Sequence, residues 1–310
     1  MISDVLATLG RNAADTFAVQ LGDQLGRLTI MHSDEADVIW ANQDGDEVSG
    51  RLRLARTLTL KPVAGDWVYV DGLRVTKVIP RRNELRRTQT HGRPAQVLAA
   101  NVDLVFIVVP LHSDLHQRMV EGLTTMALDA GATPVLVITK SDEGDAREEL
   151  ASLLARMRTL VGELTYVVTS SVTGEGVDEL RPLLTTGVTG VLLGASGAGK
   201  TSLLNALEGS HEMVKTLSRT GEGRHATSTR RLYRLSSGGV LLDIPGIRFS
   251  RAVAESGKVG PDFSDIEALA NTCEFSNCGH GTDRGCAVVA AVASGDLTQA
   301  RLDLWRERDL

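Results

Sequence analysis

The sequence predicts a multidomain protein with a small N-terminal β-barrel, a central α/β domain and a short C-terminal domain built around cysteines. Three observations predict it: short alternating runs before residue 90, apolar strands alternating with amphipathic helices after residue 96, and cysteines that all lie beyond residue 270. We expect an extension over residues 1–25, the barrel over 26–90, the α/β domain over 96–255 and the C-terminal domain, ending in a helix, over 256–310.

Composition limits the classes of protein that are possible. The chain has 310 residues, 42% hydrophobic and 23% charged, enough for more than one core. Its longest apolar run, Leu104–Val109, has the length of a strand rather than a membrane span. No basic cluster precedes an apolar segment at the N-terminus, and an odd number of cysteines argues against a disulfide framework. We expect a cytoplasmic monomer with no membrane contact.

The barrel is predicted from short runs of alternating character, punctuated by glycine, aspartate and proline. These runs are Arg27–Met31, Ala36–Trp40, Arg51–Leu54, Asp66–Val70 and Leu73–Val78. Five short strands in a segment of this size favour an OB-fold. Trp40, Trp67 and Tyr69 either stack on unpaired bases or pack in the core, and their alternating strands favour the core.

Charge is distributed unevenly along the chain. The net charge is −6, yet residues 51–100 contain eleven lysines and arginines against three acids. A basic patch of this kind suits contacts with the phosphates of RNA. A solvated surface crossed by salt bridges is the alternative.

From residue 96 onward, apolar strands alternate with helical stretches. The expected strands are Leu104–Val109, Pro134–Thr139, Leu164–Thr169, Gly190–Leu193 and Val240–Ile244. The expected helices are Leu115–Ala130, Asp145–Val161, Val177–Leu184 and Lys200–Glu208, with a tail at Leu297–Leu310. This alternation predicts a mostly parallel sheet that is covered on both faces.

A phosphate-binding loop lies between one of these strands and the helix that follows it. It matches the pattern G-x-x-x-x-G-K-[ST]. The matching residues are Gly194, Ala195, Ser196, Gly197, Ala198, Gly199, Lys200 and Thr201, and Ser202 follows them. In such P-loops the backbone N–H groups surround phosphates, the lysine reaches the terminal phosphates, and the threonine hydroxyl holds magnesium. Further along, Asp243 ends a buried strand and is placed to hold magnesium through water, and the Gly246 N–H is placed to sense the terminal phosphate.

A base-reading element precedes the P-loop instead of following it. Thr139, Lys140 and Asp142 come at the end of one strand, and Ser170 and Ser171 end the next. The Asp142 carboxylate can accept both N–H donors of guanine, the Lys140 stem can lie over the base, and the serines suit the guanine carbonyl. We therefore predict an α/β P-loop GTPase domain with circularly permuted motif order, at the carboxyl edge of the sheet.

The group that positions the attacking water is less evident. Ras-like enzymes carry a glutamine after the Asp-x-x-Gly glycine, and here that position is Ile247. The polar, basic segment 215–234 is expected to be the switch, and its His225 is the candidate to orient water. A surface histidine that binds phosphate or RNA is the alternative.

All three cysteines and one histidine lie close together in the sequence. The residues are Cys273, Cys278, His280 and Cys286, in the spacing Cys-x₄-Cys-x-His-x₅-Cys. Three thiolates and an imidazole predict a closed tetrahedral zinc site of the structural type, with free buried thiols as the alternative. Zinc would replace the hydrophobic core that this segment lacks.

Together these motifs resemble the RsgA (YjeQ/YloQ) family, circularly permuted GTPases that assist assembly of the small ribosomal subunit. The resemblance rests also on Gly65-Asp-Trp-Val, on Gln96–Asp103 and on Arg224-His225. It implies an OB-fold that contacts ribosomal RNA, a central GTPase domain that binds GTP or GDP with magnesium, and a C-terminal zinc-binding domain. It also implies hydrolysis stimulated by the small subunit, with His225 at the proposed catalytic position.

Three positions depart from the pattern of the family. Thr139 replaces an asparagine of the base-reading motif, and we expect it to loosen the pocket while Asp142 keeps selectivity. Ala226 replaces a threonine, so Thr227 becomes the candidate switch contact to magnesium, and Ile244 replaces a common threonine without consequence. Two other hypotheses stay open at this point: a P-loop ATPase or kinase without guanine selectivity, and a non-catalytic RNA-binding scaffold that uses nucleotide for structure.

Overall fold

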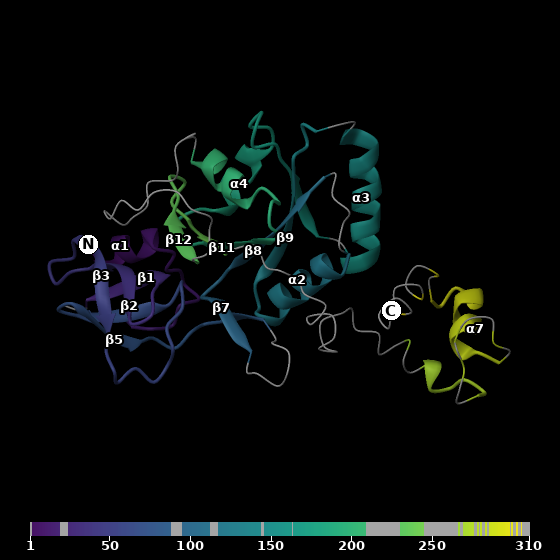
Figure 1. The fold of residues 1–310 in the computed structure, drawn as a ribbon, viewed down its shortest axis with the longest axis horizontal. Coiled ribbons are helices and arrows are strands. Elements are labelled where there is room, and N and C mark those ends of the chain that lie inside the picture. Colours follow the sequence, from purple (N-terminus) through teal and green to yellow (C-terminus); the bar gives the residue numbers. More distant parts are fainter. Residues whose placement is uncertain are drawn as a thin grey trace.

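The computed structural model describes most of the chain. The described residues are 2–18, 24–87, 95–111, 117–143, 146–162, 164–208 and 230–244, with 266, 269–275, 278, 280, 283, 285–297, 299, 302 and 305 near the C-terminus. In Figure 1 the N-terminal strands are purple and blue, the α/β domain is teal to green, and the C-terminal elements are yellow. Within the described residues, no helix combines the length and the apolar character needed to cross a membrane.

The N-terminal strands close into the five-stranded barrel that the sequence predicts. They are β1 (Leu25–Met31), β2 (Glu35–Ala41), β3 (Glu47–Leu54), β4 (Trp67–Asp71) and β5 (Arg74–Val78). The strand order is β1-β2-β3-β5-β4, and β4 pairs back with β1. Only β3 and β5 run parallel, as expected for an OB-fold. Trp40 is 7% exposed and Trp67 is 1% exposed, so both are core residues.

A short helix from the N-terminal extension completes the barrel's packing. Helix α1 (Ile2–Thr8) places Leu6 in a buried cluster with Ile39 and Trp67 of the barrel. The extension therefore contributes to the core instead of lying apart from it.

The α/β domain is built on a parallel sheet whose central strands are buried on both faces. Its parallel strands, in spatial order, are β10 (Thr165–Val168), β9 (Thr133–Thr139), β8 (Leu104–Pro110), β11 (Thr189–Gly194) and β13 (Val240–Asp243). Strand β12 (Arg231–Arg234) adds to β13 in the antiparallel direction. The strands that carry the predicted base-reading residues, β9 and β10, thus precede the P-loop strand in the chain but share one sheet with it.

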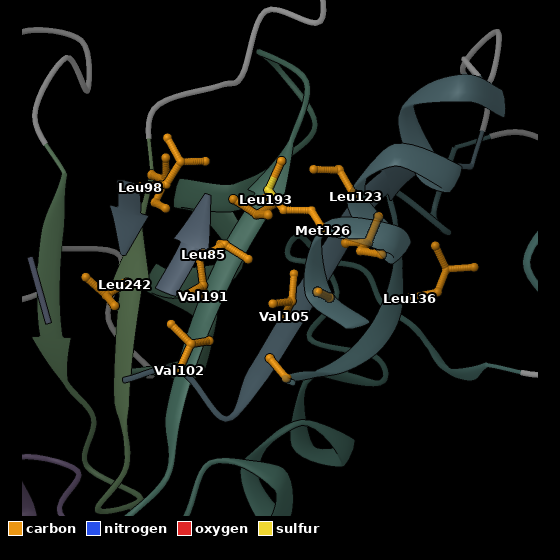
Figure 2. Packing of buried hydrophobic residues seen from close by; sticks show 14 of the residues in the cluster. Leu85, Leu98, Val102, Val105, Leu123, Met126, Leu136, Val191, Leu193 and Leu242 are labelled. Atoms are coloured by element: carbon orange, nitrogen blue, oxygen red, sulfur yellow. The ribbon is translucent and has the colours of Figure 1, made fainter. Parts of the chain in front are cut away.

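Helices cover both faces of this sheet. On one face, α2 (Gln117–Asp129) and α3 (Ala146–Val161) pack on the core drawn in Figure 2, where Leu123 and Met126 of α2 lie over Val105 and Val191 of the sheet. On the other face lie α4 (Lys200–Leu207) and two 3-10 turns, η1 (Val177–Glu179) and η2 (Arg181–Leu183). The single helix predicted over residues 177–184 is wrong, because Pro182 has no N–H to continue it.

The barrel and the α/β domain share one continuous sheet of eleven strands. Strand β12 pairs with β13 on one side and with β1 of the barrel on the other. A separate hairpin, β6 (Glu84–Arg87) and β7 (Gln96–Ala100), packs Leu85 and Leu98 against Leu242 of β13. The sequence did not predict β6, β7 or β12.

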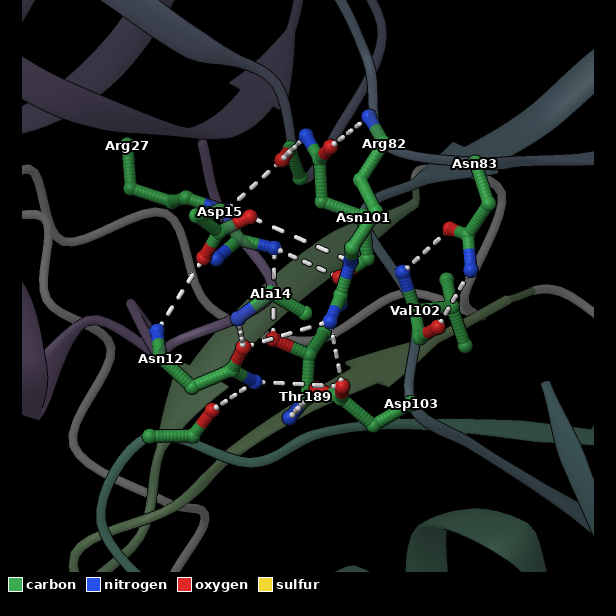
Figure 3. Close-up of polar contacts among 12 residues, drawn as sticks. Asn12, Ala14, Asp15, Arg27, Arg82, Asn83, Asn101, Val102, Asp103 and Thr189 are labelled. Carbon is green, nitrogen blue, oxygen red and sulfur yellow. Dashed lines mark hydrogen bonds and ion pairs between the residues drawn. The ribbon is translucent and has the colours of Figure 1, made fainter. Parts of the chain in front are cut away.

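A buried arginine lies where the two domains meet. The side chain of Arg27, from β1, is fully buried and donates hydrogen bonds to the carbonyl oxygens of Leu9, Gly65 and Asn101 and to Thr189 Oγ1. Figure 3 shows this junction. Because its partners come from the extension, the barrel, β11 and the connection after β7, one side chain joins four segments.

The C-terminal elements form a small core of their own. Helix α7 (Ala287–Ser294) begins at Cys286, whose Sγ accepts a hydrogen bond from the Val289 N–H. Its core contains Ile266, Cys286, Val288, Ala291, Leu297, Leu302 and Trp305. The sequence did not predict α7, and most of the predicted tail helix, Leu297–Leu310, lies outside the described residues.

Candidate nucleotide and metal sites

The P-loop follows β11 and leads into α4, as the sequence predicts. Gly194 ends β11 so close to β8 that a Cβ there would lie 2.4 Å from the Val108 carbonyl oxygen, which only glycine avoids. Gly199 has φ of 92° and forms the N-cap of α4. The loop therefore turns at glycines, and its backbone N–H groups precede the positive end of the helix dipole.

Lys200 is held inside the loop by backbone carbonyls. Its Nζ donates to the carbonyl oxygens of Gly194 at 3.1 Å and Ala195 at 2.8 Å. Burial lowers the pKa of Lys200, and the nearby Asp243 carboxylate opposes that shift. The ammonium thus lies at the mouth of the loop, where phosphate oxygens can replace the two carbonyls.

Asp243 carries the unpaired carboxylate of this edge. It is 1% exposed, and in the part of the chain that the structure describes no donor forms a hydrogen bond of good geometry to either carboxylate oxygen. Burial raises its pKa, while the charge of Lys200 and the neighbouring Thr201 side chain oppose the rise. A buried carboxylate without hydrogen bonds is costly unless a cation satisfies it. A carboxylate beside a hydroxyl is the oxygen donor set that Mg²⁺ prefers, so these residues fit that ion.

The two predicted base-reading segments meet at the ends of β9 and β10. Ser170 Oγ donates to Asp142 Oδ1 at 2.5 Å, and it accepts the N–H groups of Val172 and Thr173. Asp142 is exposed, whereas Ser170 is fully buried. Lys140 adopts a positive φ of 63° and pairs with Glu143 at 3.6 Å. The buried serine therefore fixes an exposed carboxylate at the carboxyl edge of the sheet.

Thr139, the last residue of β9, connects the predicted base-reading segments to the P-loop. Its side chain is buried, and Oγ1 donates to the Ala198 carbonyl oxygen at 2.7 Å. Ala198 itself lies in the P-loop, immediately before the glycine that caps α4. The hydroxyl of Thr139 therefore joins the end of β9 to the P-loop, and the expectation that this residue loosens the base pocket stays a prediction.

Several predicted residues are not described. His225, Thr227 and Gly246 lie outside the described residues, as does Arg224. Ser171 is half-buried in the loop after β10, and Ser196 and Ser202 are exposed near the start of α4. Their roles stay predictions from the sequence.

The cysteine cluster comes together as predicted from its spacing. Cys273, Cys278, His280 and Cys286 offer one donor atom each, and the four atoms lie within 4.8 Å of one another. His280 Nδ1 lies 3.5 Å from Cys273 Sγ and 3.6 Å from Cys286 Sγ. None of the three cysteines forms a disulfide, and the His280 ring packs edge-on against Trp305. This group can hold one metal ion.

The polar junction around Arg27 was not found from the sequence. Asp103 accepts hydrogen bonds from Arg82 Nη1 at 2.7 Å and from the Thr189 N–H at 2.8 Å, so it fixes the start of the P-loop strand. Asn101 Nδ2 donates to the Gly65 carbonyl oxygen. The segment Gln96–Asp103 carries part of the family resemblance, but nothing local in it indicates these partners.

Comparison with known proteins gives one consistent result. The sequence model of the RsgA GTPase family matches residues 78–252. The small ribosomal subunit biogenesis GTPase RsgA 2 of Lactiplantibacillus plantarum is 35% identical over 295 residues, covering 92% of this chain and 82% of that protein.

Two solved structures share the fold. YjeQ from Thermotoga maritima aligns with a TM-score of 0.58 and 25% identity, over 92% of this chain and 96% of that one. YloQ, a circularly permuted GTPase, aligns with a TM-score of 0.57 and 23% identity, over 92% and 93%. With the P-loop, the base-reading strands that precede it and the family match in agreement, the chain belongs to the RsgA GTPase family.

Proposed function

We propose that this protein hydrolyses GTP, binds the small ribosomal subunit and assists its late assembly, and that the subunit stimulates hydrolysis. The observation that carries the proposal is the meeting of the P-loop, Asp243 and the Asp142–Ser170 pair at one carboxyl edge. The relative from L. plantarum is named a small ribosomal subunit biogenesis GTPase, which agrees. An ATPase or kinase without guanine selectivity is not favoured.

At the phosphate end, Lys200 exchanges its two carbonyl partners for the terminal phosphates of GTP, and the N–H groups of residues 194–202 surround them. Thr201, Asp243 and Thr227 hold magnesium, which neutralises charge on the phosphates. The Gly246 N–H contacts the terminal phosphate, and His225 orients the attacking water.

At the base end, Asp142 accepts the guanine N–H donors and the stem of Lys140 lies over the ring. Ser170 and Ser171 face the guanine carbonyl, and Thr139 supports the base from the P-loop side. Replacing Asp142 by Asn would remove acceptor capacity for the guanine N–H groups, so GTP would lose its advantage over ATP in competition binding. Equal selectivity in wild type and variant would reject this assignment.

The barrel's contact with ribosomal RNA is part of the proposal. Arg53 of β3 and Arg74 of β5 are exposed neighbours in the barrel sheet, and Lys77 lies further along β5. Arg53 also forms an ion pair with Glu35 of β2 at 3.7 Å, so an acid lies at the border of this surface. We assign the β3–β5 surface to contacts with the RNA backbone. Replacing Arg74 and Lys77 by Gln should then make the affinity for the subunit less dependent on salt concentration.

The metal of the cysteine cluster is zinc in this proposal. Three thiolates and an imidazole form a soft, closed donor set with no position for a substrate, which is typical of structural zinc. We further propose that the protein is a monomer. We also propose that it is cytoplasmic, because cysteines stay reduced there and can serve as thiolate ligands.

Single-turnover GTP hydrolysis, measured with and without purified small subunits, tests the function. We expect slow hydrolysis alone and a strong increase with subunits. Rates no higher than in buffer under both conditions would instead indicate a non-catalytic scaffold. His225→Ala is expected to keep GTP affinity and lose the stimulated rate, and a stimulated rate equal to wild type would remove His225 from the mechanism.

A further inference from the structure

The magnesium carboxylate of the proposed site lies two strands away from the barrel. Asp243 pairs with Arg231 of β12, and Arg231 pairs with Ile30 of β1. These three residues form one row across the sheet, from the barrel to the phosphate end of the site. The backbone position of Asp243 therefore depends on β12, and the position of β12 depends on the barrel.

Two side-chain contacts hold β12 at its ends. Arg230, just before the strand, donates from Nη1 to the Val97 carbonyl oxygen of the β6–β7 hairpin at 3.0 Å. Arg234, at the far end, forms an ion pair with Glu47, the first residue of β3 in the barrel. Their partners belong to the β6–β7 hairpin and to the barrel, so segments that precede the parallel sheet in the chain hold the strand beside Asp243.

The barrel also holds the opposite end of the strands beside Asp243. Arg27 of β1 donates to Thr189 Oγ1, and Thr189 begins β11 and pairs with Val240 of β13. The barrel thus contacts the start of the β11–β13 pair through Arg27 and through the ion pair of Arg234, which lies opposite Val240. It contacts the carboxyl end through the pairing of Ile30 with Arg231, which lies opposite Asp243. Attachment at two points prevents the barrel from moving independently of these strands.

We propose that the barrel regulates the GTP site through β12, with Arg234 and Glu47 as positioning residues for Asp243. This rests on the proposed function, because it concerns how subunit binding raises the rate. A partner docked on the barrel fixes β1, and the paired strands carry that constraint to the carboxylate. Small displacements suffice, because a misplacement of about 1 Å near reacting groups costs on the order of a hundredfold in rate.

A charge-exchange cycle tests the role of the pair. Glu47→Arg places two guanidinium groups opposite each other, and Arg234→Glu places two carboxylates there. We expect each single variant to lower the ratio of stimulated to intrinsic hydrolysis about fivefold, the upper range for a partly exposed pair. The double variant E47R/R234E restores the pair with the same net charge, and the ratio should return to within about twofold of wild type. A merely destabilised protein would lose GTP affinity and intrinsic rate as well.

Hydrogen exchange of the amides in 240–243 provides a readout that needs no ribosome. Exchange should rise in both single variants and recover in the double variant. Glu35→Arg is the matched control, because Glu35 pairs with Arg53 on the barrel and the change reverses the same charge without touching β12. Unchanged exchange in the single variants, or no recovery in the double variant, would overturn the inference.

The two proposals fail in different ways. If wild-type protein shows no stimulation by subunits, the proposed function fails, and the exchange data alone decide whether the barrel positions Asp243. If wild type is stimulated but the ratio is the same in all four proteins, the regulatory inference fails and the proposed function stands.

Discussion

Thr139 shows how one side chain changes the interpretation of a motif. In the sequence it is a departure from asparagine, and its contact with Ala198 becomes visible only when β9 and the P-loop are placed side by side. Local sequence patterns predicted the P-loop and the role of Asp142, because the residues of both motifs stand at characteristic spacings in the chain. The hydroxyl of Thr139 has no such spacing, since its partner lies beyond α3, β10 and β11 in the chain.

Thr139→Val keeps the shape of the side chain and removes the hydroxyl. The buried Ala198 carbonyl then loses its donor, at a cost of about 1 kcal/mol. We expect GDP and GTP to bind about fivefold more weakly, with Thr139→Ser close to wild type. Titration with a fluorescent guanine nucleotide measures both. Equal affinity for the Val and Ser variants would show that the hydroxyl does not support the site.

A second residue-scale prediction concerns acid stability of the barrel. Burial raises the pKa of Asp37, but the hydrogen bond from Arg51 at 2.8 Å and the His32 imidazole, whose Nε2 lies 3.3 Å from Oδ2, outweigh it, and the pKa is lower than usual. A lowered carboxyl pKa gives stability that is present above the unfolded pKa near 4 and lost as pH falls through the folded pKa.

Asp37→Asn should therefore reduce the free energy of unfolding by about 1 kcal/mol at neutral pH. The difference from wild type should shrink as the pH falls below about 4. Urea denaturation at a series of pH values gives the two curves. Parallel curves down to about pH 2 would mean that the pair with Arg51 adds no pH-dependent stability.

At the scale of elements, the sequence predicted those whose signal is local and missed those that depend on distant partners. The barrel strands, β8 to β11 and β13 carry strong alternating or apolar runs. Strand β12 has four residues, Arg231 to Arg234, and two of them are charged, so only its pairing with β1 and β13 makes it a strand. The break at Pro182 is a different case. The apolar spacing of residues 177–184 suggested one helix, although the proline in it is a local signal against that helix.

Helix α7 is the subject of a prediction at the scale of elements, because its N-cap residue is also a candidate metal ligand. Cys286 caps the helix, and the small core around Val288 and Ala291 is too limited to fold without support. Removing the metal with a strong chelator should unfold this region and leave the rest intact. We expect fast hydrogen exchange in residues 287–294 with unchanged nucleotide affinity. Protection that persists in metal-free protein would show that the cluster is not what holds α7.

At the scale of the whole molecule, the barrel and the α/β domain behave as parts of one body. The permuted order places the barrel before the base-reading strands in the chain, which suggests contact with that half. The sheet instead joins the barrel to β12, next to Asp243. No pattern in the sequence could predict this, because Arg27 is an isolated cation in a barrel strand and belongs to no motif. Its four partners come together only in the folded chain.

Replacing Arg27 by Met tests whether this side chain joins the barrel to the α/β domain. Methionine fills similar space but donates no hydrogen bonds, so the carbonyl oxygens of Leu9 and Asn101 lose the Arg27 donor, and that of Gly65 keeps its bond from Asn101 Nδ2. We expect a loss of about 3 kcal/mol in the free energy of unfolding. Wild type should unfold in one transition, and Arg27→Met should separate into two as the barrel detaches. Arg53→Met is the matched control, because that arginine is exposed on the same barrel and its loss should cost under about 0.5 kcal/mol. If both variants melt together with wild type by calorimetry, the buried guanidinium does not join the domains, and the path from the barrel to Asp243 would depend on β12 alone.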